Sequence, residues 1–287
     1  MSTSSSPSSV MASQPYVINY AHAVGYDSVP AAAVFAALYV PLFGWYVLKS
    51  IKNPTYVLIV LSLFCAIRIT AFVIRAVLAS SSTAGQHIGL LIGDQILFGV
   101  GFFGLLYSAY TLVLDRELLK GTSPPRSFIL RITRNRALFR LALTSAVALG
   151  ITGTTMSQSS NPKTISTGLT LRKVGTIIFL VLTVLQAFQT LILAKIELTG
   201  KSEREADENQ SFGMKYGIYI LYIISLLLLV REAFSMATVS NMFKQSNEHF
   251  WYPLVALPEI LVVILFSTPG LVPSRSDLQR NTGKPEA

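Results

Sequence analysis

The chain has 287 residues, of which 52% are hydrophobic and only 13% charged, and its formal net charge is +9. Soluble domains usually carry about 25% charged residues, so this composition excludes an ordinary soluble protein and predicts an integral membrane protein. The basic residues lie in short loops between apolar runs, which is typical of membrane topology and not of a nucleic-acid-binding surface. Cys65 is the only cysteine, so an intramolecular disulfide and a thiolate metal cluster are excluded. We expect no cofactor, no metal and no nucleic-acid partner.

Seven apolar runs follow a Ser-rich segment, residues 1–28, which contains no Lys or Arg and is predicted to be an extracellular tail, not a cleaved signal peptide. Each run is long enough to cross roughly 30 Å of hydrocarbon. The runs are residues 30–48, 55–78, 88–114, 137–156, 174–194, 216–234 and 250–267. The sequence therefore predicts an all-α, integral membrane seven-helix bundle over residues 29–268, with a cytoplasmic tail at 269–287. Residues 1–13 and about the last fifteen are expected to be disordered.

The distribution of basic residues predicts how this bundle is oriented. The first, third and fifth loops and the C-terminal tail, counted with Arg140 at the adjoining end of the fourth run, hold 16 of the 23 Lys and Arg residues. The opposite side holds four, and the other three lie within the runs. Because cytoplasmic loops carry the excess of Lys and Arg, the N-terminus should lie outside the cell and the C-terminus in the cytoplasm.

Three cations and three anions interrupt the apolar runs. They are Arg68, Arg75, Arg231, Asp94, Glu232 and Glu259. A charge in hydrocarbon costs several kcal/mol unless a partner or water is present, so these residues should face the bundle interior. Arg68 and Arg75 are close to two helical turns apart and share one helix face. We expect Asp94 to pair with Arg68 or Arg75, and Glu259 with Arg231, whereas adjacent Arg231 and Glu232 point about 100° apart.

These charges permit three interpretations. They are structural ion pairs that lock helices together, an outward-opening polar pocket that binds a charged headgroup or small amphiphile, or an acid–base catalytic site. The residues predicted to line such a pocket are Arg68, Arg75, Asp94, Gln95, Arg231, Glu232 and Glu259. Gln186 and Gln189 would extend it or would link helices to each other.

A cluster of arginines lies on the predicted cytoplasmic side, between the third and fourth runs. It consists of Arg126, Arg131, Arg134, Arg136 and Arg140, interleaved with Phe, Ile and Leu. This composition suits contact with anionic lipid headgroups, and plain topology determination explains it equally well.

Short motifs spread over most of the chain form a recognisable set. They are Gly25-Tyr26-Asp27-Ser28-Val29-Pro30 before the first run, Arg75 in the second, Gln95 and Tyr107 in the third, Gly175 and Gln186 in the fifth, Arg231 to Phe234 in the sixth, Glu248-His249-Phe250-Trp251-Tyr252 and Ala256-Leu257-Pro258 in the seventh, and Pro269-Gly270 after it. With this set the chain resembles the fungal RTA-like, lipid-translocating exporter family of seven-helix membrane proteins. It would be a divergent member, because Ser235-Met236-Ala237 and Val255 stand where the family carries Arg, Glu and Asp.

The resemblance implies a fungal protein, at the plasma membrane, linked to lipid or amphiphile movement, to resistance against toxic compounds or to secondary-metabolite export. The leading hypothesis is a non-enzymatic protein whose partners are membrane lipids and an amphiphilic small molecule. One alternative is a seven-helix receptor or sensor that signals through the cytoplasmic arginine cluster. Another is a membrane-embedded isomerase or cyclase in which Glu259 or Asp94 donates a proton. The oligomeric state is not specified by the sequence.

Overall fold

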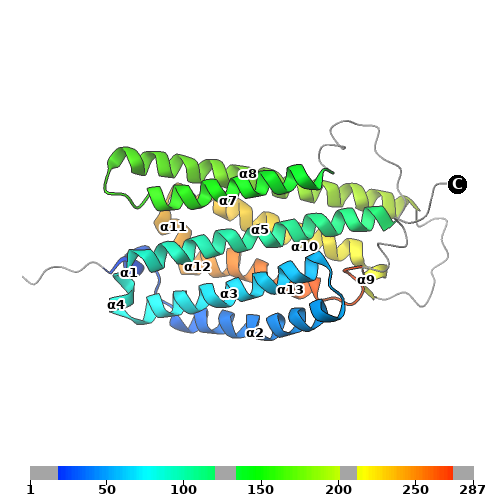
Figure 1. The fold of residues 1–287 in the computed structure, drawn as a ribbon, viewed down its shortest axis with the longest axis horizontal. Coiled ribbons are helices and arrows are strands. Elements are labelled where there is room, and N and C mark those ends of the chain that lie inside the picture. Colours follow the sequence, from blue (N-terminus) through cyan, green and yellow to red (C-terminus); the bar gives the residue numbers. More distant parts are fainter. Residues whose placement is uncertain (1–18, 120–133, 201–211, 274–287) are drawn as a thin grey trace, which may run out of the picture.

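The computed structural model describes residues 19–119, 134–200 and 212–273, and every regular element within them is helical (Figure 1). Seven helices in this part of the chain are long and apolar enough to cross a membrane, which confirms the predicted all-α seven-helix fold of a multi-pass membrane protein. They are α2 (Val29–Lys52), α3 (Tyr56–Ser80), α5 (Ile88–Leu119), α7 (Arg136–Met156), α8 (Pro162–Gly200), α10 (Gly217–Thr238), and a seventh that combines α12 (Glu248–Trp251), the π-helical turn η2 (Tyr252–Ala256) and α13 (Leu257–Phe266).

Local sequence signals explain where several of these helices begin. The Ser28 side chain accepts a hydrogen bond from the backbone of α2, and Asn135 does the same at the start of α7. The largest departure from the predicted runs is α8, which begins at Pro162 instead of residue 174. Asn161 caps this helix, and proline is favoured in a first helical turn, so the polar stretch continues the helix. Arg172 therefore lies within the bundle and not in an outer loop.

The seven helices pack into one closed bundle. Neighbours in sequence pack side by side from α2 to α13, and α13 returns to contact α2, while α5 also contacts α8 and α10. In α5, 67% of the most apolar window is buried, against 17% in α2. Hence α5 occupies the interior of the bundle, whereas α2 presents most of its surface outward.

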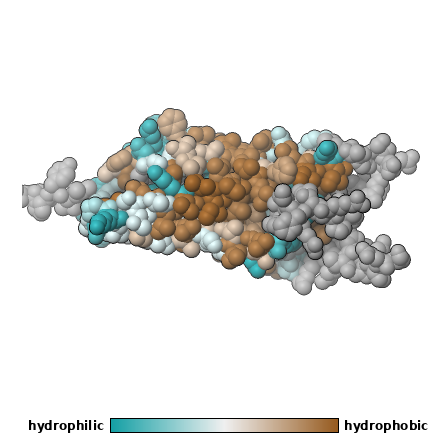
Figure 2. Space-filling view, turned by 90° about the horizontal axis from the view of Figure 1, so that it is seen from above, coloured by the Kyte–Doolittle hydropathy of each residue, from teal (hydrophilic) through white to brown (hydrophobic). Residues whose placement is uncertain are grey.

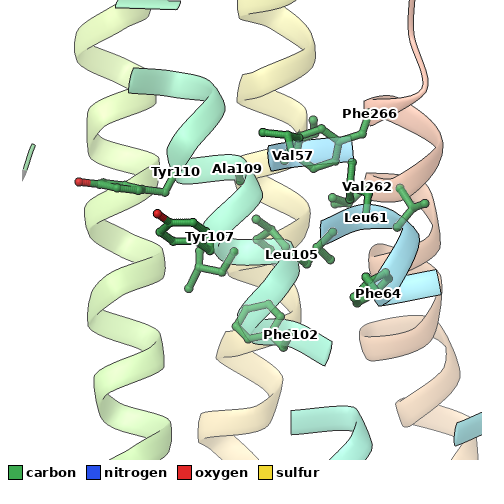
Figure 3. Close-up of a cluster of buried hydrophobic side chains, with 14 of the residues drawn as sticks. Val57, Leu61, Phe64, Phe102, Leu105, Tyr107, Ala109, Tyr110, Val262 and Phe266 are labelled. Carbon is green, nitrogen blue, oxygen red and sulfur yellow. The ribbon is translucent and has the colours of Figure 1, made fainter. Parts of the chain in front are cut away.

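The surface and the core have the polarity expected for a membrane-spanning bundle. Hydrophobic residues cover the middle of the face shown in Figure 2, and hydrophilic residues gather towards its ends. The apolar core lies where α3, α5 and α13 meet, with Leu61 and Phe64 packed near Leu105, Val262 and Phe266 (Figure 3). This packing fixes the positions of the three helices that carry Arg68, Asp94 and Glu259.

Short helices close the two ends of the bundle (Figure 1). At one end lie α1 (Tyr20–Val24), α4 (Ser82–Gly85) and α11 (Met242–Ser246), and at the other lies α9 (Phe212–Lys215). The predicted extracellular tail thus includes a folded part, because Ala21 and Tyr26 pack against Leu78 and Leu91. Leu271, in the predicted cytoplasmic tail, is also buried. The residues for which disorder was expected, 1–13 and about the last fifteen, lie outside the described ranges.

Helices α7 and α8 pack unusually closely because glycines line their contact. A Cβ at Gly153 would come within 2.6 Å of the Arg172 backbone nitrogen, and one at Gly168 within 2.5 Å of the Ser157 nitrogen. Small residues allow such backbone approach between membrane helices. The backbones of the two helices therefore lie close together, and this pair supplies one wall of the site described next.

Candidate functional site

Arg68 is the centre of a fully bonded group of buried charges. Its Nε and Nη2 each lie 2.8 Å from a carboxylate oxygen of Glu259, and its Nη1 and Nη2 donate to the carbonyl oxygens of Leu97 and Phe98 at 3.1 Å. Arg231 joins the group, with its Nε 3.1 Å from Glu259 and its Nη1 2.6 Å from Glu232. Every nitrogen of the Arg68 guanidinium therefore has a partner.

Arg75, two turns along the same helix, has a different environment. Its guanidinium carbon lies 4.0 Å from the centre of the Tyr26 ring and 3.8 Å from that of Trp251, so two aromatic rings flank it. The carboxylates of Asp94 and Glu248 are 3.8 Å and 3.7 Å away, beyond hydrogen-bonding distance. The Nε and Nη2 atoms of Arg75 are buried without a hydrogen-bond partner.

Asp94 is likewise only half satisfied. The Tyr26 hydroxyl donates to Asp94 Oδ2 at 2.7 Å, but Asp94 Oδ1 is buried and has no hydrogen-bond partner. Burial, and then the nearby Asp94 carboxylate, raises the pKa of Tyr26 well above its ordinary value, so the Tyr26 hydroxyl stays protonated and remains a donor. The neighbouring Gln95 Oε1 also lacks a partner.

These partly satisfied groups line a cavity of about 150 Å³. Its walls come from α3, α5, α7, α8, α10, the α11–α12 segment and the turn before α2. Five of the seven residues predicted for a pocket line it, namely Arg75, Asp94, Gln95, Arg231 and Glu232. Arg68 and Glu259 are not among the lining residues, and their charged groups are bonded to each other.

The two predicted charge pairs are confirmed, with two differences. Arg75 pairs with Asp94 and Arg231 with Glu259, but Arg68 contacts Glu259 and not Asp94. Arg231 and Glu232 also contact each other, although adjacent positions on a helix diverge by about 100°. Their long side chains bridge this angle, so Arg231 holds two carboxylates at once.

Sequence reasoning missed part of the site. The further polar or aromatic residues that line the cavity include Tyr26, Arg172, Gln245 and Trp251. Glu248 lies near Arg75, with its Oε1 3.7 Å from the Arg75 Nε. The predicted fifth run begins at residue 174 and so leaves Arg172 in a loop. Gly168 and Gly175, which lie close to two helical turns apart, could have revealed the longer α8. Tyr26, Glu248 and Trp251 entered the prediction only as motifs of the resemblance.

The two other predicted glutamines lie elsewhere. Gln186 donates from Nε2 to Thr190 at 3.1 Å and to Ser225 at 3.0 Å, so it links α8 to α10. Neither Gln186 nor Gln189 lines the cavity. For Gln186 the contacts favour the role of linking helices.

At the other end of α5, charged residues bond to one another. Arg136 lies 2.5 Å from Asp115, Arg134 pairs with Glu117, and Arg116 donates to the Gly213 carbonyl at 2.5 Å. Of the five arginines predicted to contact anionic lipid, Arg134 and Arg136 are thus paired within the protein. Arg140 is exposed, whereas Arg126 and Arg131 lie outside the described residues.

A scan of the chain against protein-family models found no match, and searches of curated proteins and of solved structures found no similar protein. The resemblance to lipid-translocating exporters therefore stays a prediction. The function has to be argued from the cavity itself.

Proposed function

We propose that this multi-pass membrane protein binds, or moves across the bilayer, a lipid or other amphiphile whose polar headgroup occupies the cavity. The observation that carries the proposal is the set of buried atoms without hydrogen-bond partners on Arg75, Asp94 and Gln95, all three of which line it. A buried polar group left unsatisfied costs about 1–3 kcal/mol, so such groups mark a place for a ligand or ordered water. Purely structural pairs satisfy each other, as Arg68 and Glu259 do.

The size of the cavity favours a headgroup over a whole ligand. Pockets for complete small molecules usually measure about 300–1,000 Å³, and this one is about 150 Å³. Apolar side chains share its walls with the charges, among them Val147, Phe179 and Val255. An amphiphile would place its polar end in the cavity and leave its apolar chains in the surrounding bilayer.

A neighbouring groove supports access to the cavity from the predicted outer side. This groove, about 650 Å³, is lined by residues of the turn before α2 and of the α11–α12 segment, including Asp27 and Glu248. The same two segments contribute Tyr26 and Trp251 to the cavity. Glu248, which lines the groove, has its Oε1 3.7 Å from the Nε of Arg75, which lines the cavity.

The resemblance noted in the sequence points in the same direction. Three of its motifs contain Tyr26, Arg75 and Trp251, and the rings of Tyr26 and Trp251 both contact the Arg75 guanidinium. We accordingly propose that the chain is a divergent relative of the lipid-translocating exporters. Its role would be toxin resistance or export of a secondary metabolite at the plasma membrane.

The test is binding and uptake of fluorescent short-chain lipids by vesicles that contain the purified protein. Arg75→Met and Asp94→Asn should each reduce protein-dependent binding at least about tenfold, because each removes a charged partner of the headgroup. Glu117→Gln is the matched control, since it makes the same acid-to-amide change as the Asp94 variant at the far end of α5. If vesicles with wild-type protein take up no more lipid or other amphiphile than empty vesicles, the proposal is wrong.

A further inference from the structure

Arg172 is the cavity-lining cation without a carboxylate partner. Its guanidinium donates to the side-chain oxygen of Gln245, and no ion pair connects it to an acidic residue in the described part of the chain. The other two cations that line the cavity, Arg75 and Arg231, lie within 4 Å of carboxylates. Among the cations that line the cavity, Arg172 is thus the one for which the described residues provide no carboxylate within 4 Å.

The cavity also offers free acceptors. Asp94 Oδ1 and Gln95 Oε1 are buried without partners, and neighbouring residues on one helix present them. A phosphate group cannot satisfy these oxygens, because a phosphate diester has no hydrogen to donate. Arg172, Asp94 and Gln95 all line this one cavity, so the cation without a carboxylate partner and the two free acceptors face the same space.

We propose that the headgroup bound here carries both an anionic group and an ammonium with N–H donors, as phosphoethanolamine does. This inference rests on the proposed function. The phosphate lies against Arg172, and the ammonium donates to Asp94 Oδ1 and Gln95 Oε1. Phosphocholine has the same charges, but its nitrogen carries no hydrogen, so it leaves both acceptors unsatisfied.

A series of fluorescent lipids with identical short acyl chains tests this directly on the wild-type protein. The headgroups are phosphoethanolamine, its N-methyl and N,N-dimethyl forms, phosphocholine, and phosphatidic acid. Affinity in protein-containing vesicles should fall with each N–H that is lost, by at least about tenfold from phosphoethanolamine to phosphocholine. Phosphatidic acid, which lacks the ammonium, should also bind more weakly than phosphoethanolamine.

Two variants assign the contacts. Asp94→Asn should bring the affinity ratio of phosphoethanolamine to phosphocholine close to one, whereas Glu117→Gln, the same type of change on the same helix, should preserve it. Arg172→Gln should weaken all phosphate headgroups by a similar factor. Lys163→Gln, which removes an exposed cation from the same helix, should leave their affinities unchanged.

The outcomes separate this inference from the proposed function. If no lipid or other amphiphile binds, the proposed function fails. If all headgroups bind equally well, only the headgroup inference is overturned. The headgroup inference is also overturned if Asp94→Asn keeps the wild-type affinity ratio of phosphoethanolamine to phosphocholine. Soluble glycerophosphoethanolamine serves as a competitor. If this competitor displaces the lipid at equal concentration, the headgroup chemistry is supported and the natural ligand is a water-soluble compound. If it displaces the lipid only in large excess, the natural ligand is a lipid.

Discussion

Arg68 and Arg75 occupy the same face of α3, are 0% and 1% exposed, and differ in almost every contact. Arg68 uses all its nitrogens on Glu259 and two backbone carbonyls, whereas Arg75 is held by two aromatic rings and keeps two nitrogens unbonded. Burial alone therefore does not distinguish a structural charge from an available one. The hydrogen bonds of each guanidinium do, and they assign Arg68 to the scaffold and Arg75 to the cavity.

The sharpest test of this contrast is Arg68→Met. It leaves the Glu259 carboxylate and the Leu97 and Phe98 carbonyls without this partner, and breaking a buried ion pair from one side costs about 3–5 kcal/mol. We expect a large loss of thermal stability in detergent. Size-exclusion chromatography of heated samples measures this loss. The double variant Arg68→Met/Glu259→Met should recover part of the loss, because it leaves no unpaired carboxylate. A single variant as stable as wild type would contradict the scaffold role.

Arg75→Met should reduce lipid binding strongly and stability only modestly, the opposite of what we expect for Arg68→Met. Stability should fall by only about 2 kcal/mol, the value of a desolvated contact between a cation and aromatic rings. Lipid binding should fall far more than in any variant outside the cavity. Both quantities can be measured on the same preparation, by thermal unfolding and by titration with fluorescent lipid. Equal stability losses in the Arg75 and Arg68 variants would remove the distinction between them.

Two glycines of α5 allow a finer comparison. A Cβ at Gly101 would lie 2.7 Å from Arg68 Nη1, whereas a Cβ at Gly99, which lines the cavity, has no atom of another residue within 4 Å. Gly101→Ala should therefore displace a fully bonded guanidinium and cost about 1–3 kcal/mol. Gly99→Ala should be neutral or slightly stabilising, because alanine favours a helix over glycine. Thermal unfolding of the two variants, side by side, checks the prediction.

Among the changes to residues that bond a charge, the smallest loss of stability is expected for Tyr26→Phe. This change removes one hydrogen bond to Asp94 and keeps the ring that flanks Arg75, so stability should fall by about 1 kcal/mol. Thermal unfolding measures this loss, and Tyr20→Phe, at an exposed position nearby, is the control. A loss as large as that of Arg68→Met would mean that the Asp94 site, too, is mainly structural.

The sequence predicted the number of spans and the charged residues within them, but not the full extent of the site. The predicted fifth run, residues 174–194, left Arg172 in a loop, although a capped helix that begins at Pro162 carries this residue into the bundle. The sequence also offered no reason to separate Arg68 from Arg75, since both follow the same apolar pattern. Glu248 and Trp251 showed no local signal of a contact with Arg75.

The sequence by itself determined properties that depend on short stretches of chain. These are the long apolar runs, the distribution of Lys and Arg among the loops, and the few charged residues within the runs, which must face inward because hydrocarbon excludes them. Only the tertiary structure decided which charge meets which. Arg68 and Glu259 are 191 positions apart in the chain, and they meet because side chains of α3 and α13 share one apolar cluster (Figure 3). Hydrogen bonds act over about 3 Å, so satisfied and available groups differ only once the helices are packed.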